Sequence, residues 1–398
     1  MSGPLAGLKV IELQGRGPGP FGAMVLADLG AEVVRVGRVQ DVTPPDEDGM
    51  ARMLEGRRQR DLVARGRRAV AIDLKHPEGL DAALRLIDRA DVLIEGNRPG
   101  VVERLGLGPD VCLERNPRLI YTRMTGWGQD GPYSDSPGHD INYVALSGAL
   151  YPLRRPGQAP MPPLNLLGDY GGGGMLLVVG VLGALFERAT SGRGQVIDVA
   201  MIDGVSLLTT VIHGLRAEGM WSDEPGTNVL DLGAPFYNVY ETADGRHITV
   251  GAGEAPFYAE LLERIGLDPA LVRQQGQTDT WPQVRAQLAD AFRAKTFDEW
   301  CDLLDGTNTC FAPVLTMQEA TRHPHNQARA TFVEVDGVVQ PAPAPRFSRT
   351  PAPSPGPVAA SGAHTVEVLL DWGLGHDEVD ALLDAGAVAR APAPDAEA

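Results

Sequence analysis

The chain has 398 residues, long enough for two domains, and 43% are hydrophobic and 22% charged, as in a globular protein with a full core. A formal net charge of −17 argues against nucleic acid as a partner, because the phosphate backbone would be repelled. Three cysteines without metal-ligand spacing favour a reduced, cytoplasmic location, and the start MSGPLAGLKVIEL lacks the pattern of a signal peptide.

Strand and helix patterns alternate along the first two hundred residues. Helical periodicity appears at 20–31 and 78–90. The runs that predict strands are 8–13, 31–36, 68–74, 91–96, 118–124 and 194–201. Such alternation is typical of a parallel sheet covered by helices, so we expect an α/β fold with a large, Rossmann-like domain over residues 1–227.

One run, GGGGMLLVVGVLGALF at 171–186, is apolar and uncharged. It is shorter than the roughly 20 residues that a membrane-spanning helix needs, and it is rich in glycine. We interpret it as a helix buried in the middle of the large domain, and we expect no association with a membrane.

The character of the sequence changes after residue 228. The run FYNVYETADGRHITVGA predicts a β-hairpin that turns at Asp244-Gly245, and amphipathic helices follow it. We therefore expect a small α+β domain over 228–320 and a C-terminal segment, 321–385, that returns to the large domain. Within that segment the proline-rich stretch 340–358 predicts an extended tether, and residues 386–398 predict a disordered tail.

Two loops bounded by glycine carry ionisable side chains. His139 lies in GHDINY, and Asp169 lies in LNLLGDYGGGG. Fixed charges on loops are common in active sites, but Asp and Gly are also ordinary turn and cap residues. Asp169 precedes the apolar helix and is a candidate N-cap, a position that would also place it beside free backbone amides. Glu254, between the predicted hairpin and a helix, has the same two interpretations.

A glycine pattern after the first strand formally matches the dinucleotide-binding motif G-x-G-x-x-G, with Gly17, Gly19 and Gly22. Pro18 and Pro20 remove backbone donors that a pyrophosphate would need. The second predicted strand also ends without the acidic residue that binds a ribose. These two departures from the motif therefore argue against a nicotinamide cofactor.

Arginines are concentrated between residues 57 and 68, in the run RRQRDLVARGRR. They form either a solvated surface or, with Arg35, Arg38 and Lys75, a site for a small polyanionic cofactor. These alternatives stay open on composition and spacing alone.

Several motifs, taken in order, resemble those of the α-methylacyl-CoA racemases in the family III CoA-transferase superfamily. The resemblance runs from the first strand to about residue 350 and rests on GPGPFGAMVLADLGAEVVRV, RGRRAVAIDLK, RPGVVERLGLGP, RLIYTRMTGWGQDGP, GHDINYVALSGAL, PPLNLLGDYGGGGML, LGAPFYNVYETADG, VGAGEAPFY, CFAPVLT and PAPRFS. It implies an interlocked homodimer of two-domain chains, with each active site shared between the large domain of one chain and the small domain of the other.

The resemblance also implies roles for single residues. His139 and Asp169 match the family's two acid/base groups, and Glu254 matches the glutamate that pairs with the histidine. Asn165 and Tyr237 match polar residues near the reacting carbon. The positions that match a coenzyme A site are Arg38, Ile72, Asp73, Leu74, Lys75, Arg104, Gly138, Asp140, Ile141, Asn142 and Tyr143.

The implied reaction is the epimerisation of 2-methylacyl-CoA thioesters by proton transfer through an enolate. Inversion requires groups on opposite faces of the carbon, and His139, backed by Glu254, and Asp169 match that need. We expect the backbone amide of Asp169 to hold the enolate oxygen. Coenzyme A belongs to the substrate, so neither a cofactor nor a metal is expected.

Departures from the family leave other readings open. Arg16 stands where relatives have a hydrophobic residue, and Leu232 stands where they have glycine. A racemase with a more polar acyl substrate is therefore one alternative, with Arg16 in the acyl pocket. A family III CoA-transferase that uses Asp169 as a covalent nucleophile is another. A CoA-thioester-binding protein without catalysis is a third.

Overall fold

The polypeptide forms two compact units. The computed structural model describes residues 3–42 and 61–392. The large unit comprises Met1–Ser147, Leu164–Leu208 and Ala330–Ala398, and the small unit comprises Gly148–Pro163 and Thr209–Arg329. The small unit thus begins before residue 228 and includes an excursion at 148–163, unlike the predicted division. The excursion packs on the rest of that unit, since a Cβ at Gly226 would lie 2.9 Å from Pro156.

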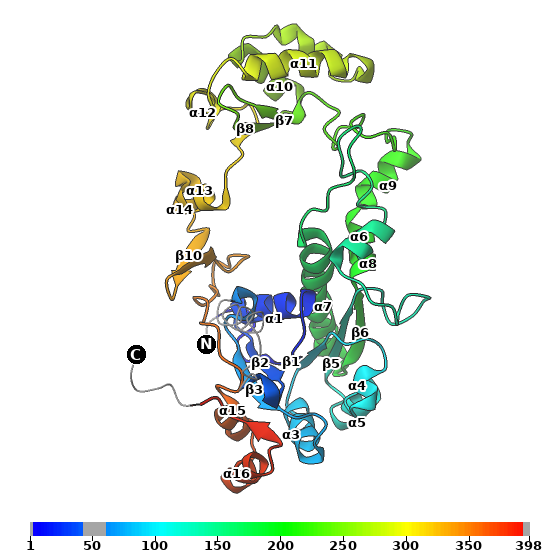
Figure 1. The fold of residues 1–398 in the computed structure, drawn as a ribbon, viewed down its shortest axis with the longest axis vertical. Helices are drawn as coiled ribbons and strands as arrows, with labels where there is room; N and C mark the ends of the chain where they lie inside the picture. The colour runs from blue at the N-terminus through cyan, green and yellow to red at the C-terminus, as the bar shows by residue number, and fades with distance from the viewer. Residues whose placement is uncertain (1–2, 43–60, 393–398) are drawn as a thin grey trace. The chain divides into compact units, whose positions relative to one another are not determined.

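A seven-stranded sheet, in the order β12-β3-β2-β1-β4-β5-β6, forms the core of the large unit (Figure 1). All neighbouring strands from β3 through β2, β1, β4 and β5 to β6 pair in parallel, and β12 pairs antiparallel with β3. Their bounds are β1 (Lys9–Leu13), β2 (Glu32–Gly37), β3 (Arg68–Ile72), β4 (Val92–Glu95), β5 (Ile120–Thr125), β6 (Gln195–Ala200) and β12 (Val388–Ala389). The predicted α/β class with a largely parallel sheet is confirmed.

Helices cover both faces of this sheet (Figure 1). Successive strand residues point to opposite faces, so Val10 packs in the layer of α1 and α7 while Ile11 packs in the layer of α3, α15 and α16. Burial on both faces explains why the strands are continuous apolar runs. The helices of this unit are α1 (Pro18–Asp28), α3 (Pro77–Ile87), α4 (Val101–Arg104), α5 (Pro109–Arg115), α6 (Asp140–Leu146), the π-helix η3 (Leu166–Met175), α7 (Leu176–Ser191), α8 (Met201–Leu208), α15 (Thr365–Asp371) and α16 (His376–Asp384).

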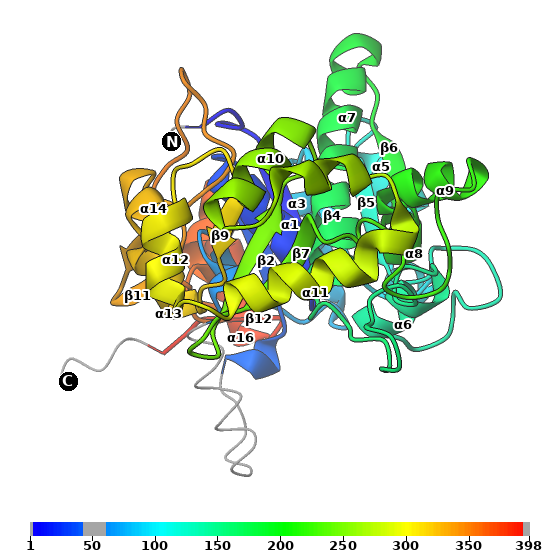
Figure 2. The ribbon, with the colours of Figure 1, turned by 90° about the horizontal axis from the view of Figure 1, so that it is seen from above.

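The small unit has its own core, in which α10, α11 and α12 pack on a three-stranded antiparallel sheet (Figure 2). The predicted hairpin is confirmed: β7 and β8 pair, and Gly245 supplies the positive φ of +74° in their turn. The strands are β7 (Tyr237–Glu241), β8 (His247–Gly251) and β9 (Phe311–Pro313), and the helices are α9 (Thr210–Ala217), α10 (Ala255–Arg264), α11 (Trp281–Phe292), α12 (Phe297–Leu304), α13 (Met317–Arg322) and α14 (Pro324–Ala328).

The C-terminal segment closes the edge of the large sheet. After the hairpin of β10 (Phe332–Val335) and β11 (Val338–Pro341), the helices α15 and α16 pack on the sheet, and β12 pairs with β3. The prediction of a disordered tail from residue 386 is therefore wrong for residues 386–392, because a short strand there satisfies its backbone on β3. Residues 393–398 lie outside the described residues.

The apolar run at 171–186 belongs to a longer helix, Leu166–Ser191, made of η3 and α7. Leu177, Val181 and Ala184 pack on the sheet, whereas Val179 and Phe186 are 61% and 82% exposed. The prediction of burial on all sides is therefore wrong for one face. By length and composition the helix would also pass as a membrane span, a criterion that core helices of soluble proteins meet as well.

Glycines seat the π-helix between α1 and α8. A Cβ at Gly172 would lie 2.7 Å from the backbone nitrogen of Val205, and one at Gly174 would lie 2.9 Å from the carbonyl oxygen of Pro18. On the facing helix, a Cβ at Gly204 would come within 1.9 Å of the carbonyl oxygen of Gly172. These helices touch backbone to backbone, so no side chain could move aside to relieve a substitution.

We expect Gly204→Ala to lower the free energy of unfolding by at least about 1–3 kcal/mol, the usual cost of overpacking against atoms that cannot move. Gly19→Ala in α1 is the matched control, because the nearest atom to its Cβ would be 3.9 Å away. Denaturant unfolding of both variants measures the difference. Equal stability of the two would mean that the contact between η3 and α8 can relax.

Candidate active site

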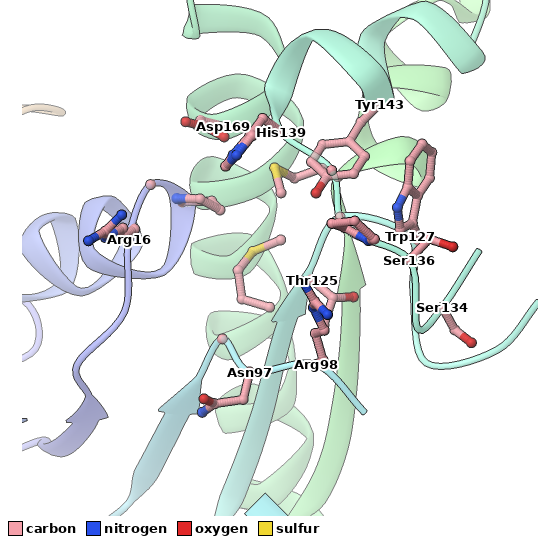
Figure 3. Close-up of a pocket in the computed structure, with 18 of the residues that line it drawn as sticks. Arg16, Asn97, Arg98, Thr125, Trp127, Ser134, Ser136, His139, Tyr143 and Asp169 are labelled. Carbon is pink, nitrogen blue, oxygen red and sulfur yellow. The ribbon is translucent and has the colours of Figure 1, made fainter. Parts of the chain in front are cut away.

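A cavity of about 330 Å³ opens at the carboxyl ends of the central strands of the large sheet (Figure 3). The strand order reverses between β1 and β4, and ligands of open α/β sheets bind at such a point. The loop after β1 contributes Arg16 to Pro18, and the loop after β4 contributes Gly96 to Pro99. His139 and Asp169 lie together on another side of this cavity.

Asp169 lies within the π-helix, where Asn165 occupies the N-cap position. The interpretation of Asp169 as a cap is therefore wrong, because the helix begins earlier than predicted. Its carboxylate lies against the β1–α1 loop, where a Cβ at Gly17 would be 3.1 Å from Oδ2. Asn165 Nδ2 donates a hydrogen bond of 3.2 Å to the same oxygen. Glycine at position 17 thus makes room for a carboxylate that Asn165 orients.

The surroundings of Asp169 shift its pKa upward. Burial raises the pKa of Asp169, the hydrogen bond from Asn165 lowers it, the charge of Asp140 raises it and His139 lowers it, with a raised pKa as the net result. A carboxyl group with a raised pKa binds a proton more readily than a free aspartate does, which suits it to proton transfer.

The backbone amide of Asp169 is already engaged. It donates a hydrogen bond of 2.7 Å to Asp140 Oδ1. The prediction that this amide holds an enolate oxygen is therefore wrong, because its hydrogen points to a carboxylate of the protein. An enolate in this cavity needs another donor.

His139 occupies the N-cap position of α6 and is exposed toward the cavity. Its backbone nitrogen donates to Asn142 Oδ1 at 3.0 Å, which fixes the start of the helix. Tyr143, one turn further, is buried against Gly126 and Gly138, where Cβ atoms would lie 2.0 and 2.8 Å from its ring. Burial raises the pKa of Tyr143, so this phenol stays protonated beside the histidine.

Two of the predicted site residues belong to the small unit. Glu254 occupies the N-cap position of α10, yet its side chain accepts no capping hydrogen bond, and it is exposed. Tyr237 begins β7 and is 43% exposed. The cavity of the large unit therefore brings together His139 and Asp169, with Asn165 bonded to the aspartate, but includes neither Glu254 nor Tyr237.

The residues that match a coenzyme A site divide into two groups. Arg38 and the segment 72–75 follow the neighbouring parallel strands β2 and β3, so they share one edge of the sheet. Arg104 ends α4, and its side chain is exposed, as are those of Arg38 and Lys75. In the second group, which begins α6, Gly138 and Tyr143 line the cavity, Ile141 and Asn142 are exposed, and the carboxylate of Asp140 is buried.

The arginine cluster is structural where it is described. Arg65 pairs with Asp28, Arg67 with Glu12, and Arg68 with Glu32. Arg35 likewise donates to the carbonyl oxygen of Ala359. The hypothesis that these side chains meet phosphates is therefore wrong for Arg65, Arg67 and Arg68, because carboxylates of the fold neutralise their charges. Residues 57–60 lie outside the described residues.

Asn97, Arg98, Trp127, Ser134 and Ser136 also line the cavity, and sequence reasoning missed them as site residues. Their common signal is position: they follow β4, which pairs with β1, and β5, which pairs with β4. The glycine pattern after β1 has a different explanation from nucleotide binding. Gly17 faces Asp169, and a Cβ at Gly22 would lie 2.8 Å from Leu177, so the pattern serves packing on the Leu166–Ser191 helix.

Comparison with known proteins decides the family. Residues 5–365 match the model of CoA-transferase family III. The chain belongs to this family. It is 47% identical to the α-methylacyl-CoA racemase of Mus musculus over 378 residues, which cover 94% of this chain and 95% of that one. The α-methylacyl-CoA racemase of Homo sapiens is 43% identical over 377 residues, with the same two coverages of 94% and 95%.

The same fold is found in a protein of known structure. A CAIB/BAIF family protein from Brucella suis matches 94% of this chain and 100% of its own, with a TM-score of 0.77 at 24% identity. The resemblance deduced from the motifs is thus confirmed at the level of family and fold.

Proposed function

We propose that this protein epimerises 2-methylacyl-CoA thioesters. The observation that carries the proposal is the pairing, in one cavity, of the His139 imidazole with the raised-pKa carboxyl of Asp169. The identity of 47% to a mouse protein named α-methylacyl-CoA racemase supports the same reaction.

The chemistry requires a base and an acid on opposite faces of one carbon. His139 removes the α-proton from one face, the electron pair moves onto the thioester oxygen, and protonated Asp169 returns a proton to the other face. The two groups end the turnover with exchanged protonation states, and proton exchange with solvent restores them. The raised pKa of Asp169 makes that carboxyl bind a proton more readily than a solvent-exposed aspartate does, which suits a group that carries a proton during the cycle.

The rival reaction is CoA transfer with Asp169 as a covalent nucleophile. In that mechanism the carboxylate of Asp169 acts alone as the nucleophile. It leaves the neighbouring imidazole of His139 without a task.

We expect His139→Ala and Asp169→Asn each to reduce epimerisation by about 10²–10⁴, the usual contribution of a positioned acid or base. The measurement is incorporation of deuterium at the α-carbon together with inversion, in D₂O and without an acceptor acid. His376→Ala, an exposed histidine at the start of α16, is the control. Turnover by the wild type only when an acceptor acid is present would replace the racemase by the transferase.

A second copy of the chain is the proposed partner. Four side chains on one face of the long helix, at a spacing of i, i+4, i+7 and i+11, are apolar and at least 37% exposed: Met175, Val179, Leu182 and Phe186. A continuous apolar row of this kind is typical of an interface. The family resemblance supports an interlocked dimer, in which Glu254 of each chain would lie beside His139 of the other.

The proposed dimer should persist at micromolar concentration, and Val179→Glu with Phe186→Glu should disrupt it, because two carboxylates would be buried in the apolar row. Light scattering after size exclusion gives the mass, and Glu187→Gln on the same helix is the control. Joint refolding of His139→Ala and Glu254→Ala chains should restore part of the activity if the site is shared. A monomeric wild type would rule out both parts.

A polar acyl chain is the second candidate substrate, and Arg16 is the observation that favours it. The side chain is exposed, lines the cavity and forms no ion pair among the described residues. It is therefore available to meet an anionic or polar group on the acyl chain.

If Arg16 selects the substrate, Arg16→Ile should raise kcat/KM for a 2-methyl fatty acyl-CoA and lower it for a carboxylated acyl-CoA, each by about tenfold, or about 1.4 kcal/mol. Initial rates with the two thioesters provide the test, and Arg329→Ile, an exposed arginine after α14, is the control. Equal changes for both thioesters would exclude Arg16 from substrate choice.

A further inference from the structure

One carboxylate joins the two loops that carry the acid/base pair. Asp140 follows His139 directly and begins α6, yet its side chain is only 8% exposed and turns toward the π-helix. There Asp140 Oδ1 accepts the 2.7 Å hydrogen bond from the Asp169 backbone nitrogen. The residue after one proposed acid/base group thus holds the backbone of the other.

The contact depends on a glycine in the π-helix. A Cβ at Gly168 would lie 2.3 Å from Asp140 Oδ1 and 2.8 Å from its Cγ, so no other residue fits there without displacing the carboxylate. On its own helix, Asp140 is followed one turn later by Val144, which also approaches Gly168. The Asp140 carboxylate is therefore fixed in place from both elements.

Stability alone is a poor explanation for this arrangement. Asp140 Oδ2 is buried and accepts no hydrogen bond from any residue that the structure describes. A buried carboxylate with an unsatisfied oxygen is costly, and an apolar side chain of similar size would avoid that cost. A costly group that contacts the backbone of a proposed catalytic residue points to a role in the site.

We infer that Asp140 is a positioning residue: its buried carboxylate fixes the backbone at Asp169 and so sets the place of that carboxyl relative to His139. This inference rests on the proposed epimerisation and adds a requirement to it. The side chain of Asp140 is then committed to the protein, so any contact of this residue with coenzyme A is made by its backbone.

The role predicts a particular pattern of loss. A displacement of about 1 Å in a reacting group costs on the order of 10²-fold in rate. Asp140→Ala should therefore reduce kcat for inversion by roughly 10–100-fold and leave KM for the thioester within about threefold. Exchange of the α-proton with retention, on the face served by His139, should persist, as in Asp169→Asn. Asp140→Asn keeps an acceptor oxygen and should recover most of the inversion.

The matched control is Asp198→Ala. Asp198 lies on β6 and also accepts a backbone hydrogen bond, of 3.0 Å from Gln129, but that donor lies in the loop after β5 and not in the π-helix. Its variant should show wild-type inversion. If KM for Asp140→Ala rises by the same factor by which kcat falls, the inference is overturned. It is also overturned if Asp140→Asn inverts the substrate no faster than Asp140→Ala.

A measurement without substrate separates this inference from the proposed function. Hydrogen exchange of the Asp169 amide should be faster in Asp140→Ala than in the wild type and in Asp198→Ala, because its acceptor is lost. Unchanged exchange would overturn the inference even in an active racemase. If the amide exchanges faster in Asp140→Ala but the wild type inverts no acyl-CoA, Asp140 still holds the Asp169 backbone, and the proposed epimerisation is refuted.

Discussion

The site depends on how closely the π-helix approaches its neighbours. Gly172 and Gly204 allow the backbones of η3 and α8 to touch, and Gly174 does the same toward α1. This close contact brings Asp169 against Gly17, at the carboxyl end of β1. A π-helix presents side chains in a different register from an α-helix, and such segments are often found at functional sites. The glycines in this region therefore fix the position of the Asp169 carboxylate.

Ion pairs within the fold also decide which basic side chains of this acidic protein stay free to bind a ligand. Much of its basic charge is neutralised in the fold: Arg67 with Glu12 and Arg123 with Glu95 are buried pairs at the sheet. Pairs of this kind contribute little net stability but are costly to break. The cations left exposed at the cavity, Arg16 and Arg98, are consequently those able to meet an anionic ligand.

The proposed chemical groups are divided between the two units. The large unit holds His139 and Asp169, while Glu254 and Tyr237 belong to the small unit. The long helix Leu166–Ser191, which begins with the π-helix, also exposes an apolar row that no described contact of the large unit covers. An assembly of two chains would account for both facts, since it would bury the row and could complete the site.

Local patterns in the sequence determined the strands, the hairpin at Asp244-Gly245 and the two loops with His139 and Asp169, because short apolar runs and turn chemistry depend on near neighbours. Only the tertiary structure decided which face of the Leu166–Ser191 helix is buried, and that Arg65 and Arg67 are paired inside the fold. It also decided that the Asp169 amide is held by Asp140. These outcomes depend on which elements pack side by side, and periodicity carries no information about the partner across a contact.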